Sequence, residues 1–329
     1  MKLRPSAESA IGRAETEDSM ARQLREFDPT TLGYLGVLSV PGYVYEPLAI
    51  LRLFALFFLF WFWPAVRGLF GDPTEDSSLE FDRGTKLRFW ASSLLSMLNP
   101  FVLVASINQL TGQLAIHARY RDGLPSPETY APETRFSLPF SGRWTAINGG
   151  STKETSHSWE VLTQRYAYDF VVIEDGTSHA GEGTRLGEYY CFDEPILAPA
   201  DGEVVAAADG HRDCPYLGGW VDPFQRDLRG NYVTIRHAED EYSVLAHLKE
   251  GSVTVREGEC VERGQPVGRC GNSGNSSEPH LHFHVQDRPE FFLGAGLPVE
   301  FVEYAVESDG ESKRRETGFV ERNQTVRSV

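Results

Sequence analysis

Hydrophobic positions follow two patterns along the chain. Residues 48–66 and 89–107 are long apolar runs, whereas from about residue 141 apolar and polar positions alternate in short stretches separated by Gly-rich turns. A run of about 20 apolar residues, rising roughly 1.5 Å per residue, can cross a hydrocarbon layer of about 30 Å. Short alternating runs predict antiparallel strands. The pattern therefore predicts helices followed by a mainly β domain.

The run at 48–66 is the better candidate for a membrane helix. Arg52 is its only charge and lies near one end, where it can snorkel, and Trp61 near the other end suits an interfacial belt. The run at 89–107 is uncharged but contains several serines and Pro100. A buried or re-entrant helix is the alternative for this second run.

The charge distribution around these runs predicts the orientation of the chain. Neither run resembles a signal peptide, so we expect the protein to stay anchored. Arg67, Arg83, Lys86 and Arg88 lie between the runs. The positive-inside bias places this loop in the cytoplasm, provided that both runs span. We therefore expect a cell-membrane protein whose β domain is extracellular.

Composition divides the chain further. Four prolines mark a spacer, and the residues after 304 are charged and poor in apolar side chains, which is typical of a mobile tail. The clearest strands are "YAYDFVVI", "GEVVAAA", "NYVTIRHA" and "EYSVLAHL". The predicted parts are a polar segment (1–46), a membrane-anchoring region (47–110), a spacer (111–140), a β domain (141–304) and a mobile tail (305–329).

One strand concentrates imidazoles. "PHLHFHVQD" puts His280, His282 and His284 at every second position, with apolar residues between them. Side chains alternate across a strand, so the histidines share one face and the apolar residues pack on the other. The alternative is a polar strand face without function. Three histidines at this spacing favour a metal site, since His is the commonest metal ligand.

Charge and cysteine spacing exclude two other classes of function. The net charge of −16 and the lack of a basic stretch argue against a nucleic-acid partner, because phosphate binding needs a basic face. The four cysteines show no C-x-x-C spacing, so a cysteine zinc site is not expected. They allow three disulfide pairings, and the sequence does not choose among them.

Two further residues are candidates for a site with these histidines. Asp169 lies in an aromatic and β-branched strand, where an isolated charge is costly to desolvate. It is either a metal ligand, an edge residue, or a partner of Arg165, four residues back. His247 ends another predicted strand, and alone it would more often be structural than catalytic.

These residues belong to a pattern that resembles the lysostaphin-type zinc metallopeptidases, a family of peptidoglycan-cleaving endopeptidases. The resemblance covers about residues 160–287 and rests on four segments in order: "PILAPADGEVVAAADG", "GNYVTIRHAEDEYSVLAHL", "VERGQPVGRCGNSG" and "PHLHFHV". It implies a compact antiparallel β-sandwich of the duplicated hybrid motif kind, with an open groove. In that family, zinc is bound by the His and Asp of an H-x-x-x-D motif and by the second His of H-x-H.

The resemblance assigns roles residue by residue. Asp169 and His282 match the carboxylate and imidazole ligands of zinc, and His280 and His247 match the histidines beside the attacking water. His237 matches a position that is not catalytic in the family.

One position departs from the family pattern. Arg165 stands where the family has a zinc-binding His, and arginine offers no acceptor for a metal. We favour His157 as the third ligand, because His179 follows in a polar, Gly-rich loop that is poorly suited to fix an imidazole. His284 is another candidate, or a group that supports the ligands.

The sequence thus predicts a membrane-anchored zinc metalloendopeptidase that cleaves a peptide bond in cell-envelope peptides, with peptidoglycan-type cross-links implied by the resemblance. A zinc-activated water would be the nucleophile. The alternative is a degenerate domain that binds a cell-surface polymer or regulates a partner enzyme. Phosphoryl transfer between histidines ranks last, because it leaves Asp169 without a role.

Overall fold

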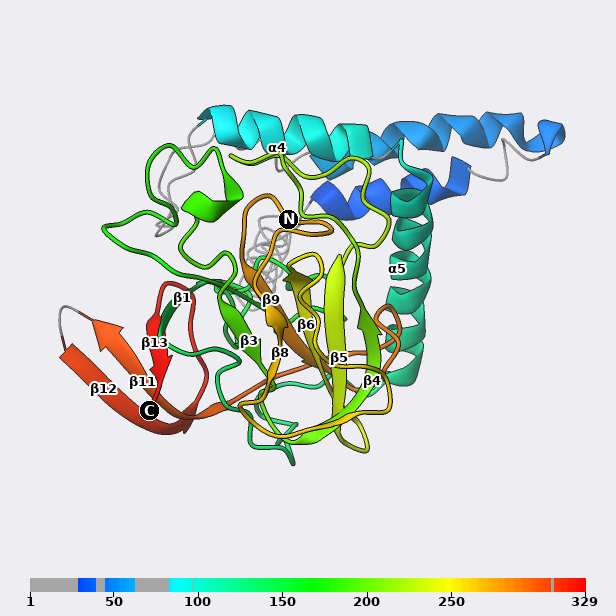
Figure 1. The fold of residues 1–329 in the computed structure, drawn as a ribbon. Coiled ribbons are helices and arrows are strands. Elements are labelled where there is room, and N and C mark those ends of the chain that lie inside the picture. The colour runs from blue at the N-terminus through cyan, green and yellow to red at the C-terminus, as the bar shows by residue number, and fades with distance from the viewer. Residues whose placement is uncertain (1–28, 40–44, 63–82, 97, 309–310) are drawn as a thin grey trace, which may run out of the picture. The chain divides into compact units, whose positions relative to one another are not determined.

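The computed structural model describes residues 29–39, 45–62, 83–96, 98–308 and 311–329 (Figure 1). The chain forms two compact units, Met1–Thr74 and Glu75–Val329. The first unit contains two 3₁₀ helices, η1 (Pro29–Ser39) and η2 (Glu46–Phe62). The predicted helix at 48–66 falls on η2 as far as Phe62, and its last four positions lie outside the described residues.

The predicted single helix at 89–107 is wrong. The chain forms α4 (Arg83–Ser96) and α5 (Pro100–Arg119) instead, and the break between them has a local cause. The Asn99 side chain accepts a hydrogen bond from the Phe101 backbone N–H at 2.9 Å, and Pro100 occupies the first turn, where its missing N–H costs nothing. These are signals for a helix start in the middle of the apolar run.

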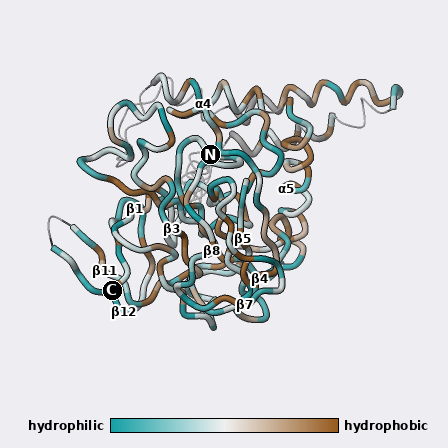
Figure 2. Tube along the Cα trace, viewed as in Figure 1, coloured by the Kyte–Doolittle hydropathy of each residue, from teal (hydrophilic) through white to brown (hydrophobic). Residues whose placement is uncertain are grey.

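Within the described residues, no single helix has both the length and the apolar character needed to cross a membrane. Leu87–Ser96 and Pro100–Arg119 meet that requirement only as a pair, and they are bent by 90° at the break. Hydrophobic positions recur along α5 (Figure 2), and Phe101, Leu103 and Ile107 are exposed.

Both helices are attached to the β domain. Arg88 Nε donates to the Gly218 carbonyl at 2.8 Å, and Asn99 Nδ2 donates to the Gln225 carbonyl at 2.6 Å. The predicted spacer at 111–140 is also wrong, because it begins inside α5 and continues as part of the core. Phe136 and Phe140 are fully buried there. Proline content suggested a linker, but these aromatic side chains hold the segment on the domain.

The expectation of a mainly β, antiparallel domain is confirmed. The strands of the large antiparallel sheet run in the order β12-β11-β13-β1-β2-β9-β6-β5-β4-β7, with β10 paired to β9, and β3 and β8 form a second, two-stranded sheet. The short helix η3 spans Leu186–Glu188. The strands are β1 (Arg143–Asn148), β2 (Tyr168–Val171), β3 (Pro195–Leu197), β4 (Gly202–Ala208), β5 (Asn231–Ala238), β6 (Glu241–Leu248), β7 (Cys260–Val261), β8 (Pro266–Arg269), β9 (Leu281–Gln286), β10 (Gly296–Leu297), β11 (Phe301–Ser308), β12 (Glu311–Gly318) and β13 (Thr325–Ser328).

Both sheets contribute to one hydrophobic core. Ile196 and Val267 of the small sheet belong to the same buried cluster as Val233, Leu245 and Phe283 of the large sheet. Each fully buried aliphatic or aromatic side chain contributes roughly 1.5–3 kcal/mol of transfer free energy. The strands that carry the site residues are therefore anchored on their apolar faces.

The predicted mobile tail at 305–329 is wrong. Strand β11 pairs with both β12 and β13, and β13 pairs with β1, so the C-terminal segment extends the sheet. Val320 and Val326 are fully buried. Half of the ten charged residues in this segment lie on β12, the edge strand, where charges are tolerated because that strand is exposed.

Candidate metal and catalytic site

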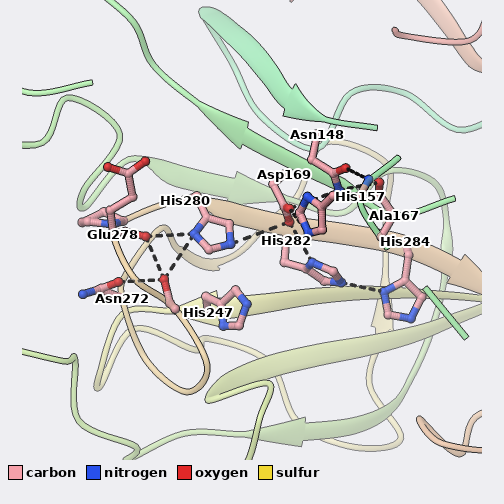
Figure 3. Close-up of polar contacts among 12 residues, drawn as sticks. Asn148, His157, Ala167, Asp169, His247, Asn272, Glu278, His280, His282 and His284 are labelled. Atoms are coloured by element: carbon pink, nitrogen blue, oxygen red, sulfur yellow. Dashed lines mark hydrogen bonds and ion pairs between the residues drawn. The ribbon is translucent and has the colours of Figure 1, made fainter. Parts of the chain in front are cut away.

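Asp169 lies at the centre of the candidate site. It is on β2, between β1 and β9, and its backbone pairs directly with His282 on β9. The carboxylate Oδ1 is 2.8 Å from His282 Nδ1, and Oδ2 accepts a hydrogen bond from Asn148 Nδ2 at 3.2 Å (Figure 3). Asp169 is therefore neither an edge residue nor, among the described contacts, a partner of Arg165.

Two further imidazoles face this carboxylate. His280 Nε2 is 3.7 Å from Asp169 Oδ1, and His157 Nε2 is 3.7 Å from Oδ2. His157 lies in the turns between β1 and β2, and its backbone N–H donates to Asn148 Oδ1 at 2.8 Å. The structure thus brings together Asp169 and three of the histidines that the sequence singled out.

The described side-chain contacts of Arg165 are with Trp159 and not with Asp169. Its Nε donates to the Trp159 carbonyl at 3.1 Å, and its guanidinium carbon lies 4.8 Å from the centre of the Trp159 ring. Arg165 also precedes β2 rather than sharing its face. His157, from a separate turn, lies beside Asp169 instead, whereas the contacts described for His179 are to Tyr189 and its own loop.

His247 and His280 are held in defined orientations next to each other, with ring centres 4.7 Å apart. His247 Nδ1 is 2.9 Å from the Ser273 carbonyl, and His280 Nδ1 is 2.8 Å from the Glu278 carbonyl. A carbonyl only accepts, so each Nδ1 carries the proton and each neutral ring keeps its lone pair at Nε2.

The backbone of His247 is strained. Its φ of +60° lies in the left-handed region, which costs a residue other than glycine about 1–3 kcal/mol. Its N–H donates to the Arg229 carbonyl, and its own carbonyl accepts from Gly271 N–H. These bonds hold a conformation that aims the imidazole at the H-x-H strand.

The electrostatics of the site separate one stable anion from neutral imidazoles. Burial alone would raise the pKa of Asp169, but the hydrogen bond with His282 and the neighbouring histidines outweigh it and hold the pKa well below its usual range. Burial, aided by the neighbouring histidines, lowers the pKa of His247 far below 6.5, and burial lowers that of His280. The carboxylate therefore stays charged while these two imidazoles stay neutral near pH 7.

Some residues at the site were not predicted from the sequence. Asn148 bonds both Asp169 and the backbone of His157, and Gln286 bonds His284, whose pKa burial lowers to about 3. Burial raises the pKa of Glu278 to about 7. Gln286 lies two residues after His284 on the same strand face, which was an available signal. Asn148 is distant in sequence and had none.

His237, expected to be structural, lies among other contacts. Its Nδ1 is 2.7 Å from the Asp201 carbonyl and its Nε2 is 2.7 Å from Ser243 Oγ. None of its described contacts is to Asp169 or the site histidines.

The donor set fits zinc in chemistry and needs a small rearrangement in position. As the side chains stand, no three His, Cys, Asp or Glu residues of the described ranges converge on a point that would hold a metal ion. Asp169 Oδ1 and His282 Nδ1 are 2.8 Å apart, a hydrogen-bond distance, whereas two tetrahedral zinc ligands lie roughly 3.4 Å apart. Zinc could be bound if the distance between Asp169 Oδ1 and His282 Nδ1 increased by about half an ångström and the mostly exposed His157 side chain rotated towards them.

Comparison with protein families finds a match that covers part of this site. Residues 188–292 match the model of peptidase family M23. This range contains His247, His280 and His282, and it begins after His157 and Asp169. The matched range includes the A-H-L and H-x-H segments and leaves Arg165 outside it.

Curated relatives match the same part of the chain. The peptidoglycan DD-endopeptidase ShyA of Vibrio cholerae is 33% identical over 107 residues, which are 32% of this chain and 21% of ShyA. The lipoprotein NlpD of Yersinia enterocolitica is 34% identical over 93 residues, 28% of this chain and 77% of that protein. The murein hydrolase activator NlpD of Salmonella typhimurium is 27% identical over 160 residues, 49% of this chain and 38% of the activator. This chain thus spans only about a fifth of the length of ShyA.

The expected resemblance to lysostaphin-type metallopeptidases is confirmed at the level of the family. The matching model, the relatives and the antiparallel β-structure agree with it. The chain belongs to peptidase family M23.

Proposed function

We propose that this protein is a zinc metalloendopeptidase that hydrolyses a peptide bond in cell-envelope peptides of the peptidoglycan type. The observation that carries the proposal is the buried Asp169 carboxylate, which is faced by His282, His280 and His157 within 3.7 Å. A carboxylate with imidazoles is a usual donor set for catalytic zinc. The substrate class is taken from the relative ShyA, which is a peptidoglycan DD-endopeptidase.

In this proposal Asp169, His282 and His157 hold the metal. When bound, zinc supplies a Lewis acid that activates water near neutral pH and polarises a peptide carbonyl. His247 and His280 have Nδ1 committed to backbone carbonyls, so each can take a proton at Nε2 and return it to the leaving amine. Once protonated, the same atoms can donate to a developing oxyanion.

We also propose that the protein is anchored at the cell membrane through the segment at 48–66, with the β domain placed outside the cell by its proposed substrate and not by charge, since the charge argument required the run at 89–107 to span as well. The apolar run with its single charge at Arg52 supports this, as does the description of one relative as a lipoprotein. A sodium carbonate wash of membranes tests it. The chain should stay with the membrane fraction, and release by the wash would contradict an integral anchor.

A non-catalytic binding or regulatory domain is the second candidate. Arg165 at a ligand position favours it, and so does the relative that is a murein hydrolase activator. Such a domain needs no metal.

Zinc content and hydrolysis together distinguish the two candidates. We expect about one zinc per full-length chain by elemental analysis and release of soluble fragments from dye-labelled peptidoglycan. His282→Ala and Asp169→Asn should lose both, with hydrolysis falling by at least about 100-fold, whereas His237→Ala should keep both. Zinc without hydrolysis would overturn the substrate class, and the absence of zinc would favour the binding domain.

A further inference from the structure

A row of hydrogen bonds continues from the site along β9. His282 Nε2 is 3.1 Å from His284 Nδ1, His284 Nε2 is 3.0 Å from Gln286 Oε1, and Gln286 Nε2 donates to the Arg288 carbonyl at 2.6 Å. The three side chains lie on one face of the strand, two residues apart, and both His284 and Gln286 are fully buried. We call His284, Gln286 and the Arg288 carbonyl the β9 relay.

The Arg288 carbonyl fixes the direction of the relay. A carbonyl only accepts, so the Gln286 amide must turn its NH₂ group towards Arg288 and its oxygen towards His284. The opposite amide orientation would set two oxygens against each other at 2.6 Å. Gln286 Oε1 therefore accepts from His284 Nε2, which carries the proton.

The hydrogen-bond direction at His284 also determines the direction of its bond with the His282 ring. A neutral His284 with its proton at Nε2 presents a lone pair at Nδ1, which accepts from His282 Nε2. His282 is then protonated at Nε2, and its other nitrogen, Nδ1, faces Asp169 Oδ1. The nitrogen of His282 beside the carboxylate is thus Nδ1, and at 2.8 Å it shares a proton with Asp169 Oδ1 while no metal is bound.

Close packing keeps the Gln286 side chain in place. A Cβ added at Gly294 would lie 2.8 Å from Gln286 Cδ and 2.9 Å from its Cβ, so the Gly294 backbone is in direct contact with this side chain. Strands β6 and β10 flank Gln286 on both sides through Tyr242 and Gly296. The relay is built into the sheet and does not depend on a mobile loop.

We propose that His284 and Gln286 are positioning residues that keep the Nε2 proton and the ring orientation of His282 fixed, with Nδ1 directed at Asp169. The inference rests on the proposed function for its consequence, because a metal beside Asp169 would take the place of the proton at Nδ1 and needs that nitrogen directed at it. His282 can then bind zinc on loss of that proton, without a rotation of the ring. His284 and Gln286 touch neither substrate nor metal in this scheme.

The tautomer can be read directly in the metal-free protein. Long-range ¹H–¹⁵N NMR spectra of the full chain labelled with ¹⁵N-histidine distinguish the two ring nitrogens of each imidazole. We expect His284 to be protonated at Nε2 and His282 to carry a proton at Nε2. Protonation of His284 at Nδ1 instead would overturn the proposal, whatever the metal affinity.

Zinc affinity, measured by competition with a chromophoric chelator, tests the consequence. Gln286→Met removes the acceptor at nearly constant volume and His284→Phe removes the relay, and each should weaken zinc binding by about 10- to 100-fold. Gln286→Glu keeps an acceptor oxygen for His284 Nε2 and should retain the His284 tautomer, but its second oxygen would face the Arg288 carbonyl, so the variant should also be less stable. Unchanged affinity in both Gln286→Met and His284→Phe would overturn the positioning role.

Matched controls separate this effect from general damage to the fold. Gln225→Met changes another buried glutamine, which bonds Asn275, and His237→Phe changes another histidine with two hydrogen bonds. Both should leave zinc affinity within about twofold. If the native chain binds no zinc while His284 is protonated at Nε2, the proposed function fails and the relay stands. If circular dichroism shows that the relay variants misfold, the NMR measurement of the His284 tautomer in the native chain decides whether the proposal holds.

Discussion

Glu278 is a buried carboxyl group beside the site, two residues before His280. Its Oε1 has no hydrogen-bonding partner among the described residues, and Oε2 accepts only a long bond of 3.4 Å from Ser178 Oγ. Burial raises its pKa from 4.5 to about 7. The folded state therefore binds a proton that the unfolded state releases between these two pH values, and this group's contribution to stability is lost as pH rises through 7.

Glu278→Gln should remove this dependence on pH. Relative to the native chain, the free energy of unfolding of the variant should rise by roughly 2–3 kcal/mol between pH 5 and pH 8, because the amide has no charged form to desolvate. Urea unfolding of both proteins at the two pH values measures it. An equal difference at both pH values would contradict the prediction.

Glu241→Gln serves as the control. The Glu241 carboxylate accepts hydrogen bonds from Tyr130 Oη and from the backbone N–H groups of Glu133 and Thr134. An amide can replace only part of this acceptor capacity, so Glu241→Gln should destabilise the fold at both pH values.

Arg165 and His157 make opposite predictions for metal binding. Arg165 packs on Trp159 and has no described contact with Asp169, so Arg165→Ala should lower the free energy of unfolding by about 1 kcal/mol and leave zinc affinity within about twofold. His157→Ala should weaken zinc binding at least about tenfold, because it removes a ligand. Calorimetric zinc titration of the two variants checks this, and loss of binding in Arg165→Ala alone would reverse the assignment.

At the scale of elements, the strand that carries the H-x-H motif is joined to α5 at its end. Asp287 follows β9 directly and accepts hydrogen bonds from Arg119 Nη2, from Tyr120 Oη at 2.6 Å and from the Ala295 backbone N–H. Burial and Asp287 raise the pKa of Tyr120 to about 12, so the phenol stays a donor. A single carboxylate thus ties the last turn of α5, the residue after it and the β9–β10 turn together.

Asp287→Asn should loosen this junction. The substitution removes one acceptor oxygen and leaves the partly buried Arg119 without its counter-charge, which we expect to cost about 2–4 kcal/mol. Hydrogen exchange of the α5 amides should accelerate more than that of β5 and β6. Glu290→Gln, an exposed acid in the same turn, should change neither, and equal acceleration in both variants would contradict the role of Asp287.

At the scale of the whole molecule, the sequence predicted the elements whose apolar pattern is local. Strands β4, β5 and β6 coincide with the predicted segments, and the apolar face of β9 (Leu281, Phe283 and Val285) is buried as expected. Local periodicity was therefore sufficient to predict these strands, but it did not predict that β6 and β9 would be buried at nearly every position rather than at every second one.

Elements that depend on distant partners were not predictable in the same way. Strands β12 and β13 contain few apolar residues, and only the pairing of β13 with β1 and β11 makes Val326 part of the core. Between α4 and α5 the capping residue Asn99 starts a new helix inside an apolar run for which hydropathy alone predicted a single helix. Local composition misled in both regions because tertiary pairing and capping outweighed it.

In the candidate site, too, some residues were predictable from the local pattern and others depend on distant partners. Asp169 and His282 were suggested by the pattern and lie in register on neighbouring strands. His157 could be favoured only because His179 lies in a polar, Gly-rich loop, since the turns from 149 to 167 have no periodicity that would place an imidazole. Its position depends on Asn148, which bonds both its backbone and Asp169.

Zinc binding should also change the stability of the whole chain, because a ligand that binds only the folded state adds its free energy of binding to folding. Free zinc at about 100 times its dissociation constant should contribute about 2.7 kcal/mol, which corresponds to roughly 5–10 °C in Tm for a domain of this size. Differential scanning calorimetry with zinc and with EDTA measures the shift at pH 7.5.

Asp169→Asn should abolish the zinc-dependent shift, measured against its own EDTA baseline, while His237→Ala should keep it. The native shift should shrink at pH 5, since the ligand nitrogens must give up protons before they can bind a metal. A shift of equal size in Asp169→Asn would mean that zinc binds elsewhere on the chain. The carboxylate between β1 and β9 would then be a structural anion held by its histidines, and the binding-domain candidate would gain the support that the metal site had lost.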